Sequence, residues 1–182
     1  GISLIACITI CIVTLQMGQI ELACITLALA GAACGFLRYN FNPAKIFMGD
    51  TGSMLLGYTM GAISVMGSVK TAATVALVVP VIVLGLPILD TLFAIVRRRI
   101  NGRPVFQPDK GHLHHRLLAM GLTQKQAVLL MYAITALLGC VSIVAAKANF
   151  VIGVLLVLAI LCACVWTATK IGIISKDNDV RK

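Results

Sequence analysis

The three histidines of this 182-residue chain form one cluster in a basic segment that runs from Arg97 to Arg116. They are His112, His114 and His115, and the cations around them are Arg103, Lys110 and Arg116. Such closely spaced residues crowd a single metal ion, and neither a cysteine nor a second histidine pair stands at a spacing typical of zinc. Imidazole and guanidinium groups donate well to phosphate oxygens. We therefore predict that this segment binds an anion rather than zinc.

A single carboxylate, Asp50, lies in the second chemically informative segment, N-F-N-P-A-K-I-F-M-G-D-T-G-S. Pro43 interrupts regular structure there, so the segment connects two helices. One interpretation is that Asp50, Thr51 or Ser53 caps the following helix. The other is that Asp50 helps to hold Mg²⁺, because hard cations take oxygen ligands and the start of a helix favours bound anions. The two roles are compatible.

Asp90 lies inside an apolar stretch, in P-I-L-D-T-L-F-A-I-V-R-R-R, roughly 10 Å of helix from its basic end. An ionisable group at such a depth is costly, so it usually faces the protein interior and marks a functional site or a buried partner. Arg97 or Arg98, one to two turns further on, can be that partner. Pro80 and Pro87 predict a kink in the same helix.

The short motifs that would identify other reactions are missing from the sequence. It has no G-x-x-x-x-G-K-[ST] loop, no nucleophile elbow and no cysteine and histidine pair. An acidic loop residue, a buried acid and a basic histidine segment together suit a metal-assisted reaction on a phosphate ester or diphosphate. Two alternatives remain, a transporter with a broken helix and a noncatalytic membrane protein that binds a lipid phosphate.

Composition indicates what must position these residues. Hydrophobic residues make up 60% of the chain, charged residues 12%, and the mean hydropathy is +1.03, which exceeds what an ordinary soluble surface carries. The apolar stretches lack the alternation of a membrane barrel and are predicted to be helices. We expect an all-α, polytopic membrane domain over 1–173 and a polar tail over 174–182. Its roughly six spans are predicted at 1–17, 20–37, 53–69, 72–96, 124–146 and 149–170.

The basic residues predict the orientation of these spans. If the spans alternate, only Lys70 and Lys147 of the 15 basic residues fall on one side, so the other side, with loops 38–52 and 97–123, is cytoplasmic. The net charge of +9 then lies mainly on the cytoplasmic face, which is expected to attract anionic headgroups and anionic soluble substrates. Nucleic acid is not an expected partner, because no recognition motif accompanies the charge. Arg97, Arg98 and Arg99 either serve topology alone or also contact substrate.

The cysteines are predicted to be small packing residues with no disulfide and no metal role. Their number is odd, and every one of them lies in an apolar stretch. They are Cys7, Cys11, Cys24, Cys34, Cys140, Cys162 and Cys164.

Three segments resemble one enzyme family. The motifs N-P-A-K-I-F-M-G-D-T-G-S, P-I-L-D-T-L-F-A-I-V-R-R-R and P-D-K-G-H-L-H-H-R-L-L are similar to those of the polyprenyl-phosphate N-acetylhexosamine-1-phosphate transferases, glycosyltransferase family 4, across most of residues 36–132. The H-L-H-H pattern resembles the branch that uses UDP-N-acetylglucosamine (UDP-GlcNAc) in teichoic acid, enterobacterial common antigen and O-antigen initiation. The branch of peptidoglycan lipid synthesis usually has three consecutive histidines followed by an acidic residue, which this chain lacks.

The resemblance implies a reaction and a set of site residues. GlcNAc-1-phosphate passes from UDP-GlcNAc to undecaprenyl phosphate and UMP leaves, in an enzyme that requires Mg²⁺, with Mn²⁺ as a substitute. By matching positions, Asp50 is the metal ligand and Asn40 lies near the nucleotide. The catalytic histidines, His112, His114 and His115, contact the diphosphate or uridine, and Arg103 and Arg116 support them. Asp90 is grouped with the substrate-binding residues in a structural or charge-positioning role.

The chain also departs from this family. An Asp-Asp pair after an early span and an N-x-x-D-G-L-D-G-type segment are typical of the family and occur nowhere in the sequence. The chain therefore resembles the C-terminal half of an enzyme with roughly eleven spans, and we predict that it is inactive alone. The expected location is the bacterial inner membrane with the site on the cytoplasmic face. The expected partners are UDP-GlcNAc, undecaprenyl phosphate and the lipid bilayer, with a homodimer as one assembly.

Overall fold

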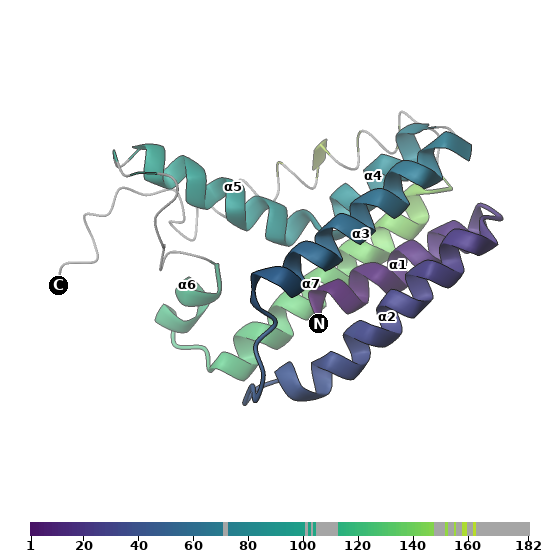
Figure 1. The fold of residues 1–182 in the computed structure, drawn as a ribbon. Helices are drawn as coiled ribbons and strands as arrows, with labels where there is room; N and C mark the ends of the chain where they lie inside the picture. The colour runs from purple at the N-terminus through teal and green to yellow at the C-terminus, as the bar shows by residue number, and fades with distance from the viewer. Residues whose placement is uncertain are drawn as a thin grey trace.

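The computed structural model describes residues 1–70, 73–100, 102, 104 and 113–147, together with residues 152, 155, 158, 159 and 162. This part of the chain is helical and contains no strand, which confirms the all-α prediction (Figure 1). Its helices are α1 (Ile2–Gln16), α2 (Ile20–Asn40), α3 (Gly49–Lys70), α4 (Ala73–Val83), α5 (Gly85–Ile100), α6 (Leu113–Ala119) and α7 (Gln124–Ala145).

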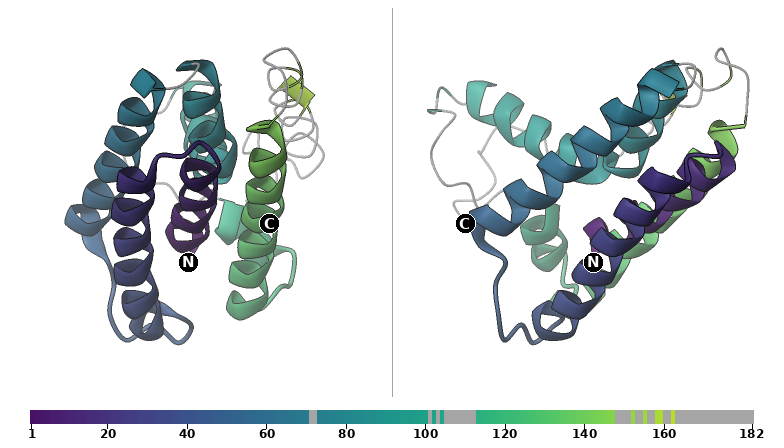
Figure 2. Two further views of the ribbon diagram at one scale, coloured as in Figure 1. Left: turned by 90° about the vertical axis from the view of Figure 1, so that its right-hand side faces the viewer. Right: turned by 45° about the vertical axis from the view of Figure 1, so that its right-hand side comes forward.

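Five of these helices pack into a bundle with α1 in its interior. Helix α1 contacts α2 and α7, and α4 contacts α3 and α7 (Figure 2). Apolar side chains of α1 to α4, such as Cys7, Met60 and Val83, form the core. Helices α1 and α7 approach closely at Gly139, where a side chain would collide with Thr9. Small residues at such crossings are typical of membrane helices, because they let two backbones approach.

The stretch expected as one span over 72–96 is two helices, α4 and α5, that meet at Leu84. Pro80 lies inside α4, and Pro87 lies in the first turn of α5, where it has no N–H to donate to the preceding turn. Helix α5 consequently leaves the direction of α4 and diverges from the bundle (Figures 1 and 2). The two prolines therefore accompany the predicted kink, which divides the expected span into two helices at Leu84.

Helices α2 and α7 are the two in the described part of the chain that are long and apolar enough to cross a membrane, and α1 is a shorter apolar helix. Large apolar side chains, such as Leu27, Leu137 and Val144, are more than half exposed, as expected for helices surrounded by lipid. The count of six spans stays a prediction. The expected span 149–170 and the tail 174–182 lie outside the described residues, apart from the five isolated positions given above.

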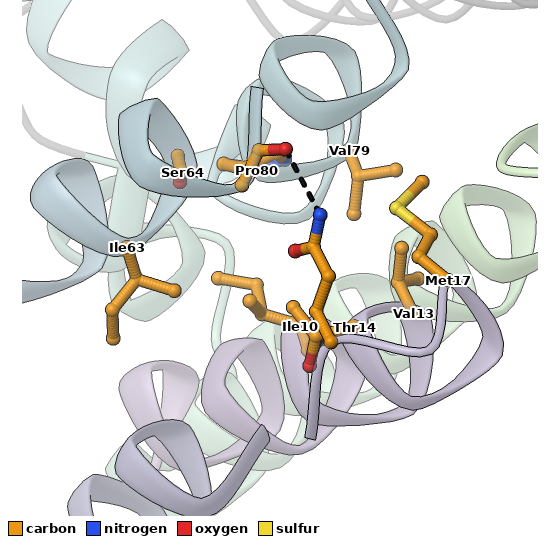
Figure 3. Close-up of a pocket in the computed structure, with 10 residues that line it drawn as sticks. Ile10, Val13, Thr14, Met17, Ile63, Ser64, Val79 and Pro80 are labelled. Atoms are coloured by element: carbon orange, nitrogen blue, oxygen red, sulfur yellow. Dashed lines mark hydrogen bonds between the residues drawn. The ribbon is translucent and has the colours of Figure 1, made fainter. Parts of the chain in front are cut away.

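Gln19 closes the end of the bundle at which α1 turns into α2. Its side chain is 8% exposed and its Nε2 donates to the carbonyl oxygen of Gly67 on α3, at 3.1 Å. A small pocket lies around it, and Figure 3 shows Thr14, Ser64 and Pro80 in its walls among apolar side chains. The Oε1 atom of Gln19 has no hydrogen-bond partner within the described part of the chain. The Gln19 side chain is therefore buried at this end of the bundle, where its hydrogen bond joins α3 to the turn between α1 and α2.

Candidate active site

Asn40 is the last residue of α2, which extends three residues beyond the predicted boundary at 37. Its side chain is half-buried, and Nδ2 donates to the carbonyl oxygen of Ile46 at 3.0 Å. The carbonyl oxygen of Tyr39 accepts from the backbone N–H groups of Lys45, at 2.8 Å, and Ile46, at 3.3 Å. Asn40 and its neighbour therefore fold the connection between α2 and α3 back onto the end of α2.

Asp50 lies in the first turn of α3, because this helix begins at Gly49 and not at the predicted residue 53. Gly49 has a φ of 66°, a left-handed conformation that favours glycine at this turn. The carboxylate of Asp50 is exposed, and the hydroxyl of Ser53 donates to the backbone oxygen of Asp50 at 2.9 Å. Asp50, Thr51 and Ser53 all lie inside the helix, so the interpretation that one of them is its N-cap does not hold.

The described histidines are on α6, a short helix that begins in the last part of the basic segment. His114 and His115 are both exposed, and their ring centroids are 4.0 Å apart with the planes inclined at 37°. Arg116, next in sequence, is half-buried, and Leu117 is 6% exposed. Helix α6 thus presents two imidazoles while an apolar side chain attaches it to the protein.

Asp90 lies on α5, and its Oδ1 accepts a hydrogen bond from the backbone N–H of Leu113, the first residue of α6, at 2.7 Å. The side chain is half-buried. The sequence predicts a partner for this acid on its own helix, at Arg97 or Arg98. The hydrogen bond to Leu113 adds a partner from a different helix, so Asp90 touches the helix that carries the predicted site residues.

The three consecutive arginines of α5 differ in exposure. Arg97 is 5% exposed, Arg98 is half-buried and Arg99 is exposed. A buried guanidinium costs far more than an exposed one unless it has partners. The hypothesis that these residues serve topology alone therefore suits Arg99 and does not suit Arg97.

A pocket open to solvent brings two of the predicted residues together. Asn40 and His114 both line it, between the end of α2, helix α6 and the first half of α7. The open space amounts to about 830 Å³. Gly1, Ile2 and Ser3 contribute from the start of the chain, and α7 contributes Gln124 and Tyr132. The pocket is therefore mainly apolar with a few polar groups, which is typical of small-molecule sites.

Met48 connects this pocket to the turn that carries Asp50. It lines the pocket, and its side chain lies so close to Gly52 that a Cβ there would meet it at 2.5 Å. Gly52 is in the first turn of α3, two residues after Asp50. Asp50 itself is not among the residues that line the pocket. Asp50 is therefore related to the pocket through the turn that carries Met48, and its carboxylate is exposed there.

Gln124, Met131 and Tyr132 are pocket residues that the sequence reasoning missed. They fall at helical spacing on one side of α7, together with Ala127 and Val128. The sequence signal for them is that polar groups interrupt an apolar helix face at two points. That signal is weak, because membrane helices commonly carry tyrosine and glutamine near their ends.

The metal prediction rests on Asp50 alone. The described residues contain no group of three or more His, Cys, Asp or Glu side chains that could hold a metal ion, and their six cysteines are free. Mg²⁺ is commonly held by one or two carboxylates together with substrate phosphates, so Asp50 fits as a single ligand of such an ion. Two other predicted site residues, His112 and Arg103, lie outside the described residues.

Known proteins related to this chain share part of its sequence. The sequence profile of glycosyl transferase family 4 matches residues 1–68, which include Asn40 and Asp50. The chain is 46% identical over 134 residues to a probable undecaprenyl-phosphate N-acetylglucosaminyl 1-phosphate transferase of Bacillus subtilis, covering 74% of this chain and 37% of the relative. It is 44% identical over 151 residues to a decaprenyl-phosphate N-acetylglucosaminephosphotransferase of Mycolicibacterium smegmatis, covering 72% of this chain and 37% of the relative.

A third relative belongs to another branch. A phospho-N-acetylmuramoyl-pentapeptide-transferase of Moorella thermoacetica is 38% identical over 136 residues, with 74% of this chain and 40% of the relative covered. The matched region thus spans well under half the length of each of these three relatives. No solved structure matches the chain. The matches to the profile and to both kinds of transferase agree, and the chain belongs to glycosyl transferase family 4.

Proposed function

We propose that this chain is part of an enzyme that transfers GlcNAc-1-phosphate from UDP-GlcNAc to undecaprenyl phosphate and releases UMP. The observation that carries the proposal is the pocket shared by Asn40 and His114, in a chain related to such transferases. These two residues come from different helices, α2 and α6. Polar side chains that converge on one open pocket are expected of a binding site.

The reaction needs positive charge more than it needs covalent chemistry from the protein. An oxygen of the lipid phosphate attacks the phosphorus that carries GlcNAc, the bond between the two phosphates breaks, and UMP leaves. Negative charge on the phosphate oxygens must be balanced throughout. His114 and His115 donate hydrogen bonds to the diphosphate, and Arg116 adds a cation to them. Asn40 binds the nucleotide.

Mg²⁺ is the proposed cofactor, with Asp50 as one of its ligands. When bound, the ion neutralises charge on the diphosphate. Asp50 would hold the ion with its carboxylate, which is exposed on the turn that follows the pocket residue Met48. His112 and Arg103 are proposed as further hydrogen-bond donors to the diphosphate.

The proposed donor is UDP-GlcNAc. The relatives of the GlcNAc branch are 46% and 44% identical, whereas the relative named for N-acetylmuramoyl-pentapeptide is 38% identical. The H-L-H-H order of the histidine segment supports the same choice. We place the reaction on the cytoplasmic face of the bacterial inner membrane, where 13 of the 15 basic residues gather, at the first membrane step of a teichoic acid or O-antigen type of polymer.

The test is UMP release by the full-length gene product, reconstituted with UDP-GlcNAc, undecaprenyl phosphate and Mg²⁺. Asp50→Asn should lower kcat by at least about 100-fold, because the ion loses a ligand and its charge is no longer balanced. Asp177→Asn, the same change in the expected tail, is the matched control and should retain activity. Full activity of Asp50→Asn would refute the metal assignment. Absence of UMP release from the wild-type protein would favour a transporter or a noncatalytic phosphate-binding protein.

The 182-residue chain alone should release no UMP, because the Asp-Asp pair and the second aspartate-rich segment are not in its sequence. The measurement is the same assay on the purified chain in lipid nanodiscs. Activity at the level of the full-length protein would show that those acidic residues are dispensable.

A further inference from the structure

Asp90 accepts a hydrogen bond from the first residue of α6, the helix that carries His114 and His115. Its Oδ1 lies 2.7 Å from the backbone nitrogen of Leu113, which begins α6, although 23 residues separate the two in sequence. The N–H groups in the first turn of a helix have no acceptor within the helix. An acidic side chain at that position satisfies one of them and interacts favourably with the positive end of the helix.

Helix α6 depends on contacts with the rest of the protein because it has only seven residues. Isolated helices shorter than roughly 12 residues are barely stable in water. The Asp90 carboxylate attaches it at Leu113, and the burial of Leu117 attaches it one turn later. The first attachment is a backbone N–H at the N-terminal end of α6, and the second is a side chain on its flank.

The adjacent side of α6 meets the pocket. His114 and Leu118, again four residues apart, both line it. Rotation or displacement of α6 would move these two side chains together, since both belong to the same short helix. The orientation of His114 therefore depends on the hydrogen bond to Asp90, even though Asp90 does not line the pocket itself.

We propose that Asp90 is a positioning residue: it orients α6 so that His114 faces the pocket, and it acts on the substrate only through that helix. This inference rests on the proposed function in one respect, namely that the pocket takes the nucleotide sugar. The contact between Asp90 and α6 is independent of the reaction and can be measured without it.

The test uses three variants of the full-length protein. Asp90→Ala removes the acceptor and should lower kcat/KM for UDP-GlcNAc by about 10- to 100-fold, because small displacements of a positioned group have effects of that size. Asp90→Asn keeps an oxygen at the same distance and should stay within about threefold of the wild type, since the hydrogen bond persists. Asp90→Glu keeps the charge but moves the oxygen by one methylene, and should be impaired.

Hydrogen exchange of peptides that cover residues 113–119 is the readout that does not need activity. Exchange there should accelerate in Asp90→Ala and remain near the wild-type rate in Asp90→Asn, because local opening of α6 becomes easier only when the acceptor is lost. Thr91→Val is the matched control. It removes a neighbouring side-chain bond to Pro87 on the same helix and should change neither exchange nor kcat/KM.

Unchanged exchange in a folded Asp90→Ala protein would overturn the proposal, as would an Asn variant as impaired as Ala. If Asp90→Ala does not fold, the other two variants decide. A higher kcat/KM for Asp90→Asn than for Asp90→Glu supports positioning by the hydrogen bond, and any other order overturns it. If the wild-type protein releases no UMP, the proposed function fails while the exchange experiment still decides the role of Asp90.

Discussion

The two ends of α1 meet polar groups in opposite ways. At its C-terminal end, the Gln19 side chain is buried and its amide nitrogen is bonded to the Gly67 carbonyl. At its N-terminal end, the polar pocket residues Asn40 and His114 are half-buried or exposed. The length of α1 separates the two ends by roughly 22 Å. At one end a polar side chain joins two helices by a hydrogen bond. At the other end polar side chains line a pocket that is open to solvent.

This difference is visible in where the donors point. At the Gln19 end the hydroxyls of Thr14 and Ser64 donate to carbonyls of their own helices, at 2.9 and 2.7 Å. Those donors are used within the protein, so this pocket offers mainly acceptors. At the other end two neighbouring imidazoles remain exposed. Substitutions at the first end should therefore change stability, and those at the second should change catalysis.

The largest effect is expected from Gln19→Glu. A buried carboxylate would replace the Nε2 donor and face the Gly67 oxygen, which should lower the free energy of unfolding by about 3–5 kcal/mol at neutral pH. The destabilisation should shrink as the pH approaches about 4, where the carboxyl is protonated in both the folded and unfolded states. Thermal unfolding in nanodiscs measures it. Gln16→Glu, on the exposed last residue of α1, is the control and should cost little; equal losses would contradict the difference between the ends.

At the open end, His114→Ala should lower kcat/KM for UDP-GlcNAc by about 100-fold, since an imidazole donor to the diphosphate is lost. Its Tm should stay near that of the wild type, because the side chain is exposed. UMP release and thermal unfolding are measured on the same preparation. Lys125→Ala, on an exposed neighbour outside the pocket lining, should leave both unchanged. A lowered Tm with unchanged kcat/KM would show that His114 stabilises the fold and does not bind the diphosphate.

Gly139→Leu tests the closed part of the bundle where α1 crosses α7. The new side chain would meet Thr9, so overpacking should cost about 1–3 kcal/mol of stability. Gly57→Leu is a matched control, because open space surrounds Gly57 on α3. The measurement is the Tm of both variants. Equal Tm values would mean that the crossing is looser than the structure shows.

The smallest effect is expected from Tyr132→Phe. If its hydroxyl contacts the nucleotide sugar, its loss should raise KM about 2- to 10-fold and leave kcat unchanged, the change expected for one hydrogen bond made equally to substrate and transition state. Tyr58→Phe, on a side chain that is 79% exposed, is the control. A change in kcat alone would give Tyr132 a different role, and no change would remove it from the site.

Part of the candidate site could be proposed from the sequence because residue type limits chemistry. Asp50 and the histidines stand out in the sequence alone, since polar residues are conspicuous in a chain that is 60% hydrophobic, whereas Asn40 came from the family resemblance. The interruption near Pro80 and Pro87 was also predictable, because proline lacks the N–H that a helix needs. Helix ends were less predictable: Asp50 belongs to α3, although polarity placed it in a loop.

The sequence by itself determined that the fold is helical, which stretches avoid water, and which side chains can meet a phosphate. Only the tertiary structure decided that Asp90 binds the start of α6, that Arg97 is buried while Arg99 is exposed, and that Tyr132 joins the pocket. The physical reason is that these features depend on interactions between residues far apart in the sequence. Apolar periodicity and side-chain chemistry are local properties, whereas these contacts depend on how separate helices are oriented, and a bond such as that between Asp90 and Leu113 forms only after they pack.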